Sequence, residues 1–355
     1  MTPAQQQAKR TSINFGKVDK FFFLGGGQCL FDAVCHLKSR GFATIVITSD
    51  RHYHADVNMD RQRKPLFDAL ASVGIECLLV KQLDVDLKIF DGFDSTSLAV
   101  TPSAEWIFKE SLIEKLSGRI VNIHGSHLPE MKGGGGLSWN LMMGVKECGA
   151  TIHMIDSGID TGDILLQQKY QLPESVSVLS EAMAIAQLRN SQLMISFLDK
   201  VVAGETFLRQ SQETESGSYW PRLRTDTHGF IDWTWSANEI SLFCSAFSAP
   251  YKGASTFLDD KRVRIFKCRE DTERRVFHPF QYGLVFRVGN GVAYIAAKGS
   301  ALIVDEIKYE TGVAVDVQRL LGRRLHSTPG FLEAAIRQRV VFGKVSDLDE
   351  YRVNL

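Results

Sequence analysis

The first 125 residues of this 355-residue chain alternate short apolar runs with amphipathic helical segments. Lys20–Leu24 is an apolar run closed by three glycines, and Gln28–Arg40 follows with its apolar residues along one helical face. The same patterns predict a helix at Lys64–Val73 and strands at Ala43–Ile47, Glu76–Val80 and Ser97–Thr101. Strands separated by helices need right-handed crossovers, so we predict an α/β fold with a doubly wound, mainly parallel sheet.

The pattern changes after about residue 172. Val178–Ala203 is long, periodic and uninterrupted, which predicts a helix. From residue 250 onward the chain reads as short strands separated by turns, which is typical of a small β-barrel. These strands are predicted at Ala254–Leu258, Val263–Lys267, Gly283–Val288, Ala293–Ala297 and Leu302–Tyr309. We therefore predict four parts: a flexible arm (1–17), a catalytic domain (18–204), a linker (205–248) and a barrel-like C-terminal domain (249–355).

Composition favours a cytoplasmic protein. The formal net charge is zero, so the total gives no sign of a polyanionic partner. Six cysteines contain no CxxC pair, which is typical of reduced thiols in a cytosolic protein. No apolar run approaches the ~20 residues of a membrane span, and the polar start does not resemble a signal peptide.

Several side chains suited to catalysis lie in one segment of the chain, residues 121–163. In the predicted strand around Val121–His124, Asn122 and His124 point to the same face because strand side chains alternate. The turn 156–163, Asp-Ser-Gly-Ile-Asp-Thr-Gly-Asp, follows a second apolar run, Ala150–Ile155. If the two strands are neighbours, an amide, an imidazole and the carboxylate of Asp160 converge at one rim. The amide can stabilise an oxyanion, and the imidazole can exchange protons near neutral pH.

Other readings of the polar and glycine-rich motifs remain open at this stage. Gly25–Gly27 with Asp50 suggests dinucleotide binding, but Leu30 stands where a third glycine is expected. The four glycines 133–136 lack the Lys-Ser/Thr of a phosphate loop. The HxxH pattern of His124 and His127, and the pair His52 and His54, are weak metal signals without a third ligand. Ser126 lacks the strand-turn-helix elbow of a nucleophile.

The chain resembles the methionyl-tRNA formyltransferase family and its relatives, the sugar N-formyltransferases. The likeness lies in NIHGSHLP (122–129), the glycine-rich loop, and DSGIDTGDI (156–164). It extends to YWPR (219–222), GFIDW (229–233) and APYKGA (249–254), and so covers roughly residues 20–310. Two departures stand out. The family usually has Ser-Leu-Leu-Pro where this chain has Ser126-His127-Leu128-Pro129. The family's loop commonly runs Arg-Gly-Ala-x-Pro, whereas here Lys132 is followed by four glycines.

The resemblance implies transfer of a formyl group from 10-formyltetrahydrofolate to an amine, without a metal. It makes Asn122, His124 and Asp160 the catalytic residues. It also implies a Rossmann-like catalytic domain followed by an OB-like barrel. The cosubstrate site is expected at Thr101, Ser103, Asp156, Gly158 and Asp163. The acceptor site is expected at Trp106, His127, Gly134, Gly135, Trp220 and Tyr251, although packing is the alternative for the aromatic residues.

The acceptor divides the family. We predict a nucleotide-linked amino sugar, in surface polysaccharide biosynthesis, because the chain is neutral and its segment 51–64 mixes acids with bases. Initiator Met-tRNA is the alternative acceptor. A 10-formyltetrahydrofolate hydrolase and a non-catalytic binding protein are further alternatives. No nucleic-acid or membrane partner is expected, and sugar-acting relatives suggest a homodimer.

Overall fold

The computed structural model describes residues 11–212 and 217–338. A seven-stranded sheet forms its larger unit, in the order β11-β10-β8-β7-β2-β3-β6. Strands β2, β3, β6, β7 and β8 run parallel to one another, and β10 runs antiparallel to both of its neighbours, β8 and β11. The bounds are β2 (Lys20–Leu24), β3 (Ala43–Thr48), β6 (Cys77–Leu79), β7 (Ser97–Pro102), β8 (Ile120–His124), β10 (Glu147–Met154) and β11 (Ile164–Gln171).

Apolar layers cover both faces of this sheet. Phe21 and Phe23 of β2 face one layer, and Phe22 and Leu24 face the other, because strand side chains alternate. The first layer is formed by α1 (Gly27–Ser39), α3 (Leu66–Ser72) and the C-terminal half of α6 (Leu179–Val202). The second contains η1 (Lys88–Gly92) and α4 (Glu110–Lys115). The predicted doubly wound, mainly parallel fold is confirmed.

The smaller unit is an antiparallel sheet of order β16-β17-β18-β15-β14-β19. A bridge between Leu284 and Arg324 joins its two ends, so the sheet curls into the predicted barrel-like shape. The bounds are β14 (Ala254–Leu258), β15 (Lys261–Arg274), β16 (Val285–Gly289), β17 (Val292–Ala296), β18 (Ser300–Tyr309) and β19 (Leu325–His326), with η2 (Pro279–Gln281) and η3 (Val317–Leu320) between strands.

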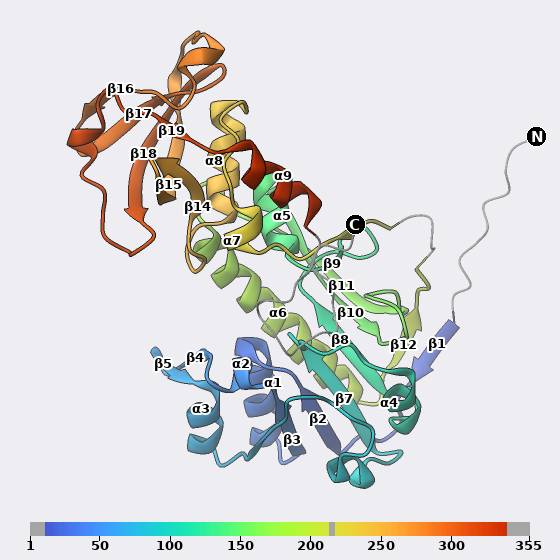
Figure 1. Ribbon diagram of the computed structural model, residues 1–355. Helices are drawn as coiled ribbons and strands as arrows, with labels where there is room; N and C mark the ends of the chain where they lie inside the picture. The colour runs from blue at the N-terminus through green and yellow to red at the C-terminus, as the bar shows by residue number, and fades with distance from the viewer. Residues whose placement is uncertain (1–10, 213–216, 339–355) are drawn as a thin grey trace, which may run out of the picture.

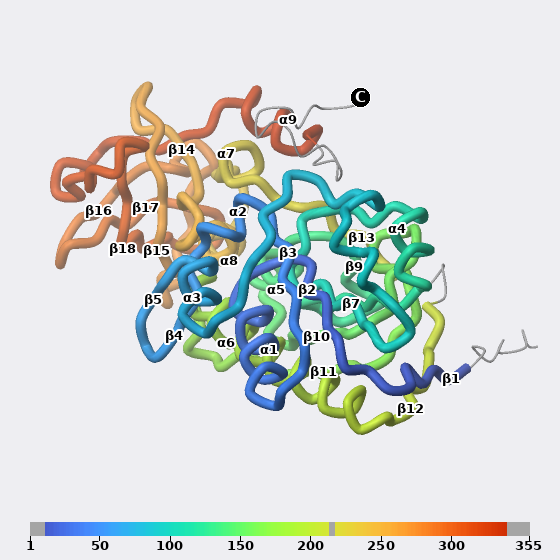
Figure 2. Tube along the Cα trace, turned by 90° about the horizontal axis from the view of Figure 1, so that it is seen from below, coloured from blue at the N-terminus to red at the C-terminus, as the bar shows by residue number. Residues whose placement is uncertain are grey.

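Helix α6 connects the two units (Figure 1). Its first turns, including Leu179 and Ala182, pack into the core of the smaller unit. Its last turns, including Phe197 and Leu198, pack on the large sheet. The core of the smaller unit also contains residues of α5 (Gly136–Met142) and α8 (Ala237–Ala246). The barrel strands and the pair β1–β12 lie at opposite ends of the molecule (Figure 2).

Two predicted segments differ from the structure. Thr11–Asn14, predicted as part of a flexible arm, form β1 and pair with β12 (Thr206–Arg209), because Phe15 packs edge-on against Phe197 and Phe207. The predicted linker 205–248 contains β12, β13 (Tyr219–Trp220), α7 (Thr225–His228) and α8, and α8 belongs to the C-terminal core. Residues 1–10 and 339–355 of the predicted parts lie outside the described residues, and the domain bounds stay predictions.

The remaining elements are short. The helix predicted at 64–73 begins only at Leu66, because Lys64 and Pro65 end a hairpin. That hairpin joins β4 (Asp56–Met59) and β5 (Gln62–Pro65) after α2 (Asp50–Tyr53). β9 (Lys132–Gly133) and α9 (Pro329–Arg337) complete the elements. In the described parts of the chain, no helix is long and apolar enough to cross a bilayer.

Candidate active site

Three neighbouring strands align a row of polar side chains. Thr101 of β7 is in register with Asn122 of β8, and Asn122 is in register with His153 of β10. Residues in register project from the same face of a sheet. Thr101 and His153 are buried, and Asn122 lies between them.

This row fixes the amide of Asn122. The Thr101 hydroxyl donates to Asn122 Oδ1 at 3.0 Å, and Asn122 Nδ2 lies 3.1 Å from His153 Nε2. His153 Nδ1 lies 2.7 Å from the carbonyl of Met154 and donates to it. In a neutral ring, His153 Nε2 therefore accepts one amide hydrogen of Asn122. The other amide hydrogen stays available to the cavity.

Asp160 is held by the turn that joins β10 to β11. Its backbone has a φ of 54°, the left-handed region that Asp tolerates better than most residues. Asp156 Oδ1 accepts hydrogen bonds from the Gly158 amide and the Thr161 hydroxyl, at 3.0 and 2.6 Å. A Cβ on Gly162 would lie 1.9 Å from the Met154 carbonyl oxygen, so only glycine lets this turn close on the strand.

The Asp160 carboxylate is surrounded by two imidazole rings and a backbone amide. Oδ2 accepts from the Gly133 amide at 2.8 Å and lies 3.5 Å from His124 Nδ1. Oδ1 lies 3.6 Å from His153 Nε2. Burial alone would raise the pKa of Asp160, but His124, His153 and the Gly133 amide outweigh it and lower this pKa to about 2. Asp160 is therefore ionised at neutral pH.

His124 lies between two oxygen acceptors. Its Nε2 donates to the Met131 carbonyl at 2.7 Å, and its Nδ1 faces Asp160. With the ring proton on Nε2, Nδ1 is free to accept a proton. The resulting imidazolium lies at ion-pair distance from the Asp160 carboxylate.

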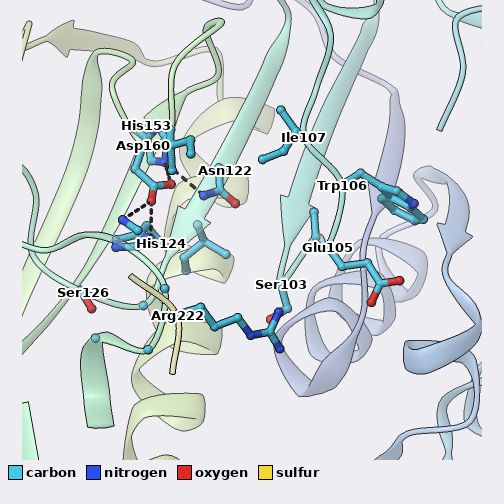
Figure 3. A pocket seen from close by; sticks show the side chains of 18 of the residues that line it. Ser103, Glu105, Trp106, Ile107, Asn122, His124, Ser126, His153, Asp160 and Arg222 are labelled. Atoms are coloured by element: carbon cyan, nitrogen blue, oxygen red, sulfur yellow. Dashed lines mark hydrogen bonds and ion pairs between the residues drawn. The ribbon is translucent and has the colours of Figure 1, made fainter. Parts of the chain in front are cut away.

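These residues line a cavity of about 450 Å³. Figure 3 shows Asn122, His124, His153 and Asp160 gathered on one side, with Ser103, Glu105 and Trp106 on the other. The four-glycine segment and Arg222 also line it. A cavity of this size lies within the usual range of small-molecule sites.

The cavity brings together most residues predicted from the sequence. The predicted trio Asn122, His124 and Asp160 converges there. Of the residues predicted for the cosubstrate and the acceptor, the following line it: Ser103, Asp156, Gly158, Trp106, Gly134, Gly135 and Tyr251. Trp106 is nearly buried, and its Nε1 donates to the Lys81 carbonyl, so the ring also packs as part of the core.

Four predicted binding residues do not line the cavity. Thr101 is fully buried behind Asn122, because it lies one strand further into the sheet. Asp163 pairs with Arg209 at 2.7 Å, and His127 pairs with Glu130 at 3.1 Å. Trp220 packs on Trp139, with ring centres 5.2 Å apart. These contacts place the four side chains outside the cavity lining, and their binding roles stay predictions.

Neither the interpretation of Ser126 as a nucleophile nor the metal interpretation of the histidine pairs is supported by the geometry. The Ser126 hydroxyl makes no hydrogen bond to either imidazole of the site. His124 and His127 face different carboxylates, so the HxxH pattern does not converge. Among the described residues, no three His, Cys, Asp or Glu side chains gather as a metal site requires.

Sequence reasoning missed His153 and Arg222. His153 is 2% exposed and bridges Asn122 and Asp160. A histidine inside the apolar run Ala150–Ile155 was the available signal. Arg222 is the last residue of the segment YWPR (219–222), which the sequence singled out without giving Arg222 a role, and its position in the cavity was not visible there.

Sequence comparison identifies methionyl-tRNA formyltransferases as relatives of this chain. A 28% identical methionyl-tRNA formyltransferase of Clostridium novyi aligns over 203 residues, 57% of this chain and 63% of that protein. One from Desulfotalea psychrophila is 30% identical over 57% of this chain and 60% of its own length. The chain thus spans less than two thirds of these curated relatives.

Structure comparison finds the same fold at low identity. WlaRD, a sugar 3N-formyl transferase with dTDP and 5-N-formyl-THF, matches with a TM-score of 0.63 and 18% identity, over 83% of this chain and 99% of that one. An N-formyltransferase from Helicobacter canadensis, in complex with folinic acid and dTDP-3-aminofucose, matches with a TM-score of 0.63 and 18% identity, over 80% and 98%. HypX from Aquifex aeolicus with tetrahydrofolic acid matches with a TM-score of 0.56 and 15% identity, over 85% and 47%.

Two family models match this chain in succession and together span most of it. The model described as "Formyl transferase" matches residues 19–194, and "Formyl transferase, C-terminal domain" matches residues 224–324. With the cavity geometry and the shared fold, these matches assign the chain to the formyltransferase family.

Proposed function

We propose that this protein transfers the formyl group of 10-formyltetrahydrofolate to the amino group of a nucleotide-linked amino sugar. The observation that carries the proposal is the convergence of Asn122, His124 and Asp160 in one cavity of suitable size. Two structures with the same fold support the folate and nucleotide-sugar substrates: one holds 5-N-formyl-THF with dTDP, and the other holds folinic acid with dTDP-3-aminofucose.

The reaction needs one addition and one elimination. The neutral amine of the acceptor attacks the formyl carbon, a C–N bond forms, and the carbonyl electrons move onto oxygen. The amine loses a proton, the bond from carbon to N10 of the folate breaks, and N10 takes up a proton. The products are a formamide and tetrahydrofolate, and neither a metal nor a covalent enzyme intermediate is required.

Asn122 is suited to stabilise the oxyanion of the tetrahedral intermediate. Thr101 and His153 fix the direction of its amide, so its remaining N–H is already oriented before substrate binds. A pre-oriented donor at a developing oxyanion contributes ~3 to 4 kcal/mol to transition-state stabilisation.

His124 is suited to accept the amine proton. Its Nε2 is engaged by the Met131 carbonyl, so the proton goes to Nδ1. The new charge then lies 3.5 Å from the ionised Asp160. Asp160 therefore orients and charge-balances His124, and the protonated ring can return the proton to N10.

Formylation of initiator Met-tRNA is the second candidate, because the curated relatives with 28–30% identity are methionyl-tRNA formyltransferases. A tRNA acceptor requires phosphate contacts, which make binding strongly dependent on salt. The zero net charge of the chain favours the small acceptor.

Mass spectrometry of an acceptor panel tests the proposal. Purified protein and 10-formyltetrahydrofolate are incubated with nucleotide-linked amino sugars, with initiator Met-tRNA, and with no acceptor. We expect one sugar to gain the mass of one CO. Formylation of Met-tRNA alone would replace the proposal by the second candidate, and formate release without an acceptor would indicate a hydrolase.

A further inference from the structure

The four-glycine loop serves as a docking edge for a distant segment. Residues 219–220 form β13, which pairs in parallel with β9 at 132–133. The Lys132 amide donates to the Ser218 carbonyl, and the Gly134 amide donates to the Trp220 carbonyl, both at 3.0 Å. A Cβ on Gly133 would lie 2.3 Å from the Trp220 carbonyl oxygen, so the absence of a side chain permits this pairing.

The chain is also anchored immediately after β13. Trp139 donates from Nε1 to the Pro221 carbonyl at 2.9 Å, and its ring packs against Trp220. Arg222 follows at once and lines the cavity. In Figure 3 its side chain extends from the side of Ser126 toward Ser103. The loop and its docked segment therefore deliver one guanidinium into the catalytic cavity.

Arg222 has no carboxylate partner among the described residues. The acids that line the cavity are Glu105, Asp156 and Asp160. Asp160 is engaged by His124, His153 and Gly133, and Asp156 by Gly158 and Thr161. Among the described residues, Glu105 forms no ion pair with Arg222 (Figure 3). A half-buried guanidinium without a counter-charge is a binding group for an anionic ligand.

Two other basic residues, Arg51 and His52, line the same cavity as Arg222. Burial, and then the charges of Arg51 and Arg222, lower the pKa of His52 to about 4 against the opposing effect of Glu105. His52 is therefore neutral at neutral pH and adds no charge to the cavity beside Arg222.

We propose that Arg222, placed by the four-glycine loop, binds the diphosphate of the nucleotide-linked acceptor. This inference rests on the proposed function, whose acceptor class supplies the diphosphate. A guanidinium fork forms paired hydrogen bonds with phosphate oxygens, and such pairs position a ligand as well as bind it. The carboxylates of the folate offer related chemistry, so the test must separate the two sources.

Calorimetric titration with two probes makes this separation. Nucleoside diphosphates and 5-formyltetrahydrofolate are titrated separately into the wild type, Arg222→Gln, Arg222→Lys and Arg189→Gln. Arg189 is the control, because it is exposed on α6 next to the cavity-lining Asn190. Among the described residues, its guanidinium hydrogen-bonds only to the side chain of Gln192. We expect R222Q to weaken diphosphate binding at least about tenfold, with folate binding unchanged. R222K keeps the positive charge but lacks the forked guanidinium, so its diphosphate affinity should lie between those of the wild type and R222Q.

Three results would overturn the inference: unchanged diphosphate affinity in R222Q, a selective loss of folate binding, or no diphosphate binding by the wild type. Thermal melting of each variant confirms that it is folded. The titration needs no turnover. A wild type that binds diphosphates through Arg222 but formylates no sugar would refute the proposed function and leave Arg222 as a diphosphate-binding residue.

Discussion

At the scale of single residues, the site depends on how four side chains share their hydrogen bonds. Asn122 takes its orientation from Thr101 and His153, and Asp160 lies between His153 and His124. His153 Nε2 accepts from Asn122 in the neutral ring and donates toward Asp160 in the protonated ring. The amide, the two imidazoles and the carboxylate are therefore coupled.

Removing any member of the trio should abolish most of the rate. We expect Asn122→Ala, His124→Ala and Asp160→Asn each to lower kcat at least about a hundredfold, the scale of oxyanion and general-base groups. Asn tolerates the left-handed backbone of residue 160, so that variant isolates the charge. Steady-state kinetics measures the effect. Ser126→Ala should stay within about tenfold of the wild type, and an equal loss there would contradict direct attack.

His153 should act as a positioning residue. His153→Gln keeps an oxygen acceptor for Asn122 but removes the ring that faces Asp160. We expect kcat to fall about tenfold with little change in either KM, because the lost interaction orients reacting groups. Unchanged kcat in a variant with a wild-type melting temperature would remove His153 from the site.

The ionised form of Asp160 should stabilise the fold. Its pKa in the folded protein is about 2, below the ordinary 3.8, so its contribution is present above about pH 4 and is lost as the pH falls toward 2. The shift corresponds to about 2 kcal/mol for a side chain that is 14% exposed. Urea unfolding of the wild type and Asp160→Asn should differ by this amount at pH 5 and by about half of it at pH 3.

A surface carboxylate supplies the baseline for that measurement. Asp91 is 71% exposed and pairs with Lys115, so Asp91→Asn reports the pH dependence of an exposed ion pair. If the difference between the wild type and Asp160→Asn did not change between pH 5 and pH 3, the lowered pKa of Asp160 would be wrong.

The sequence predicts which residues belong to the site where a strand pattern or a turn motif indicates their position. Asn122 and His124 follow from strand alternation, and Asp160 from the glycine-rich turn. His153 and Arg222 could not be predicted in the same way, because strand register and β9–β13 pairing bring them to the cavity. The ion pairs of Asp163 with Arg209 and of His127 with Glu130 could not be predicted either, because the tertiary fold sets them.

At the scale of elements, the pairing of β9 with β13 links the glycine loop to both halves of the site. Gly133 donates its amide to Asp160 and lies against the Trp220 carbonyl. Its φ of 94° also disfavours any side chain. The loop therefore supports the catalytic carboxylate and the segment that carries Arg222.

Adding one methyl group to Gly133 should damage this link. Gly133→Ala forces β13 away from β9, so we expect a higher KM for the acceptor, a lower kcat, and a loss of about 1 to 3 kcal/mol in stability. Kinetics and thermal melting measure these effects. The control is Gly330→Ala in α9, where the new Cβ meets nothing within 4 Å. Equal behaviour of both variants would contradict the docking role of the loop.

The elements best predicted were those with strong local patterns. β2 and β14 have the predicted bounds, and α6 falls within one residue of its prediction at each end. β1 and α8 were missed because their formation depends on distant partners: β12 for β1, and the barrel core for α8. Long-range pairing has no signature within the segment that undergoes it.

At the scale of the whole molecule, α6 joins a sheet unit and a barrel unit, and the cavity draws residues from distant parts of the chain. Tyr251 of the C-terminal segment lines the same cavity as His52. The sequence predicted two folded parts of the right class but not their shared core through α5, α6 and α8. A substrate with a reacting amine and a charged tail would contact both parts.

Transfer of a labelled formyl group tests the central claim most directly. The protein is incubated with 10-formyltetrahydrofolate carrying carbon-13 in the formyl group and with a nucleotide-linked amino sugar, and the label is followed by NMR. We predict that it appears as a formamide carbon on the sugar nitrogen. We also predict that His124→Ala, which should still bind 5-formyltetrahydrofolate, does not produce this signal. Label found only in formate, or a formamide signal of wild-type rate from the His124 variant, would contradict the account.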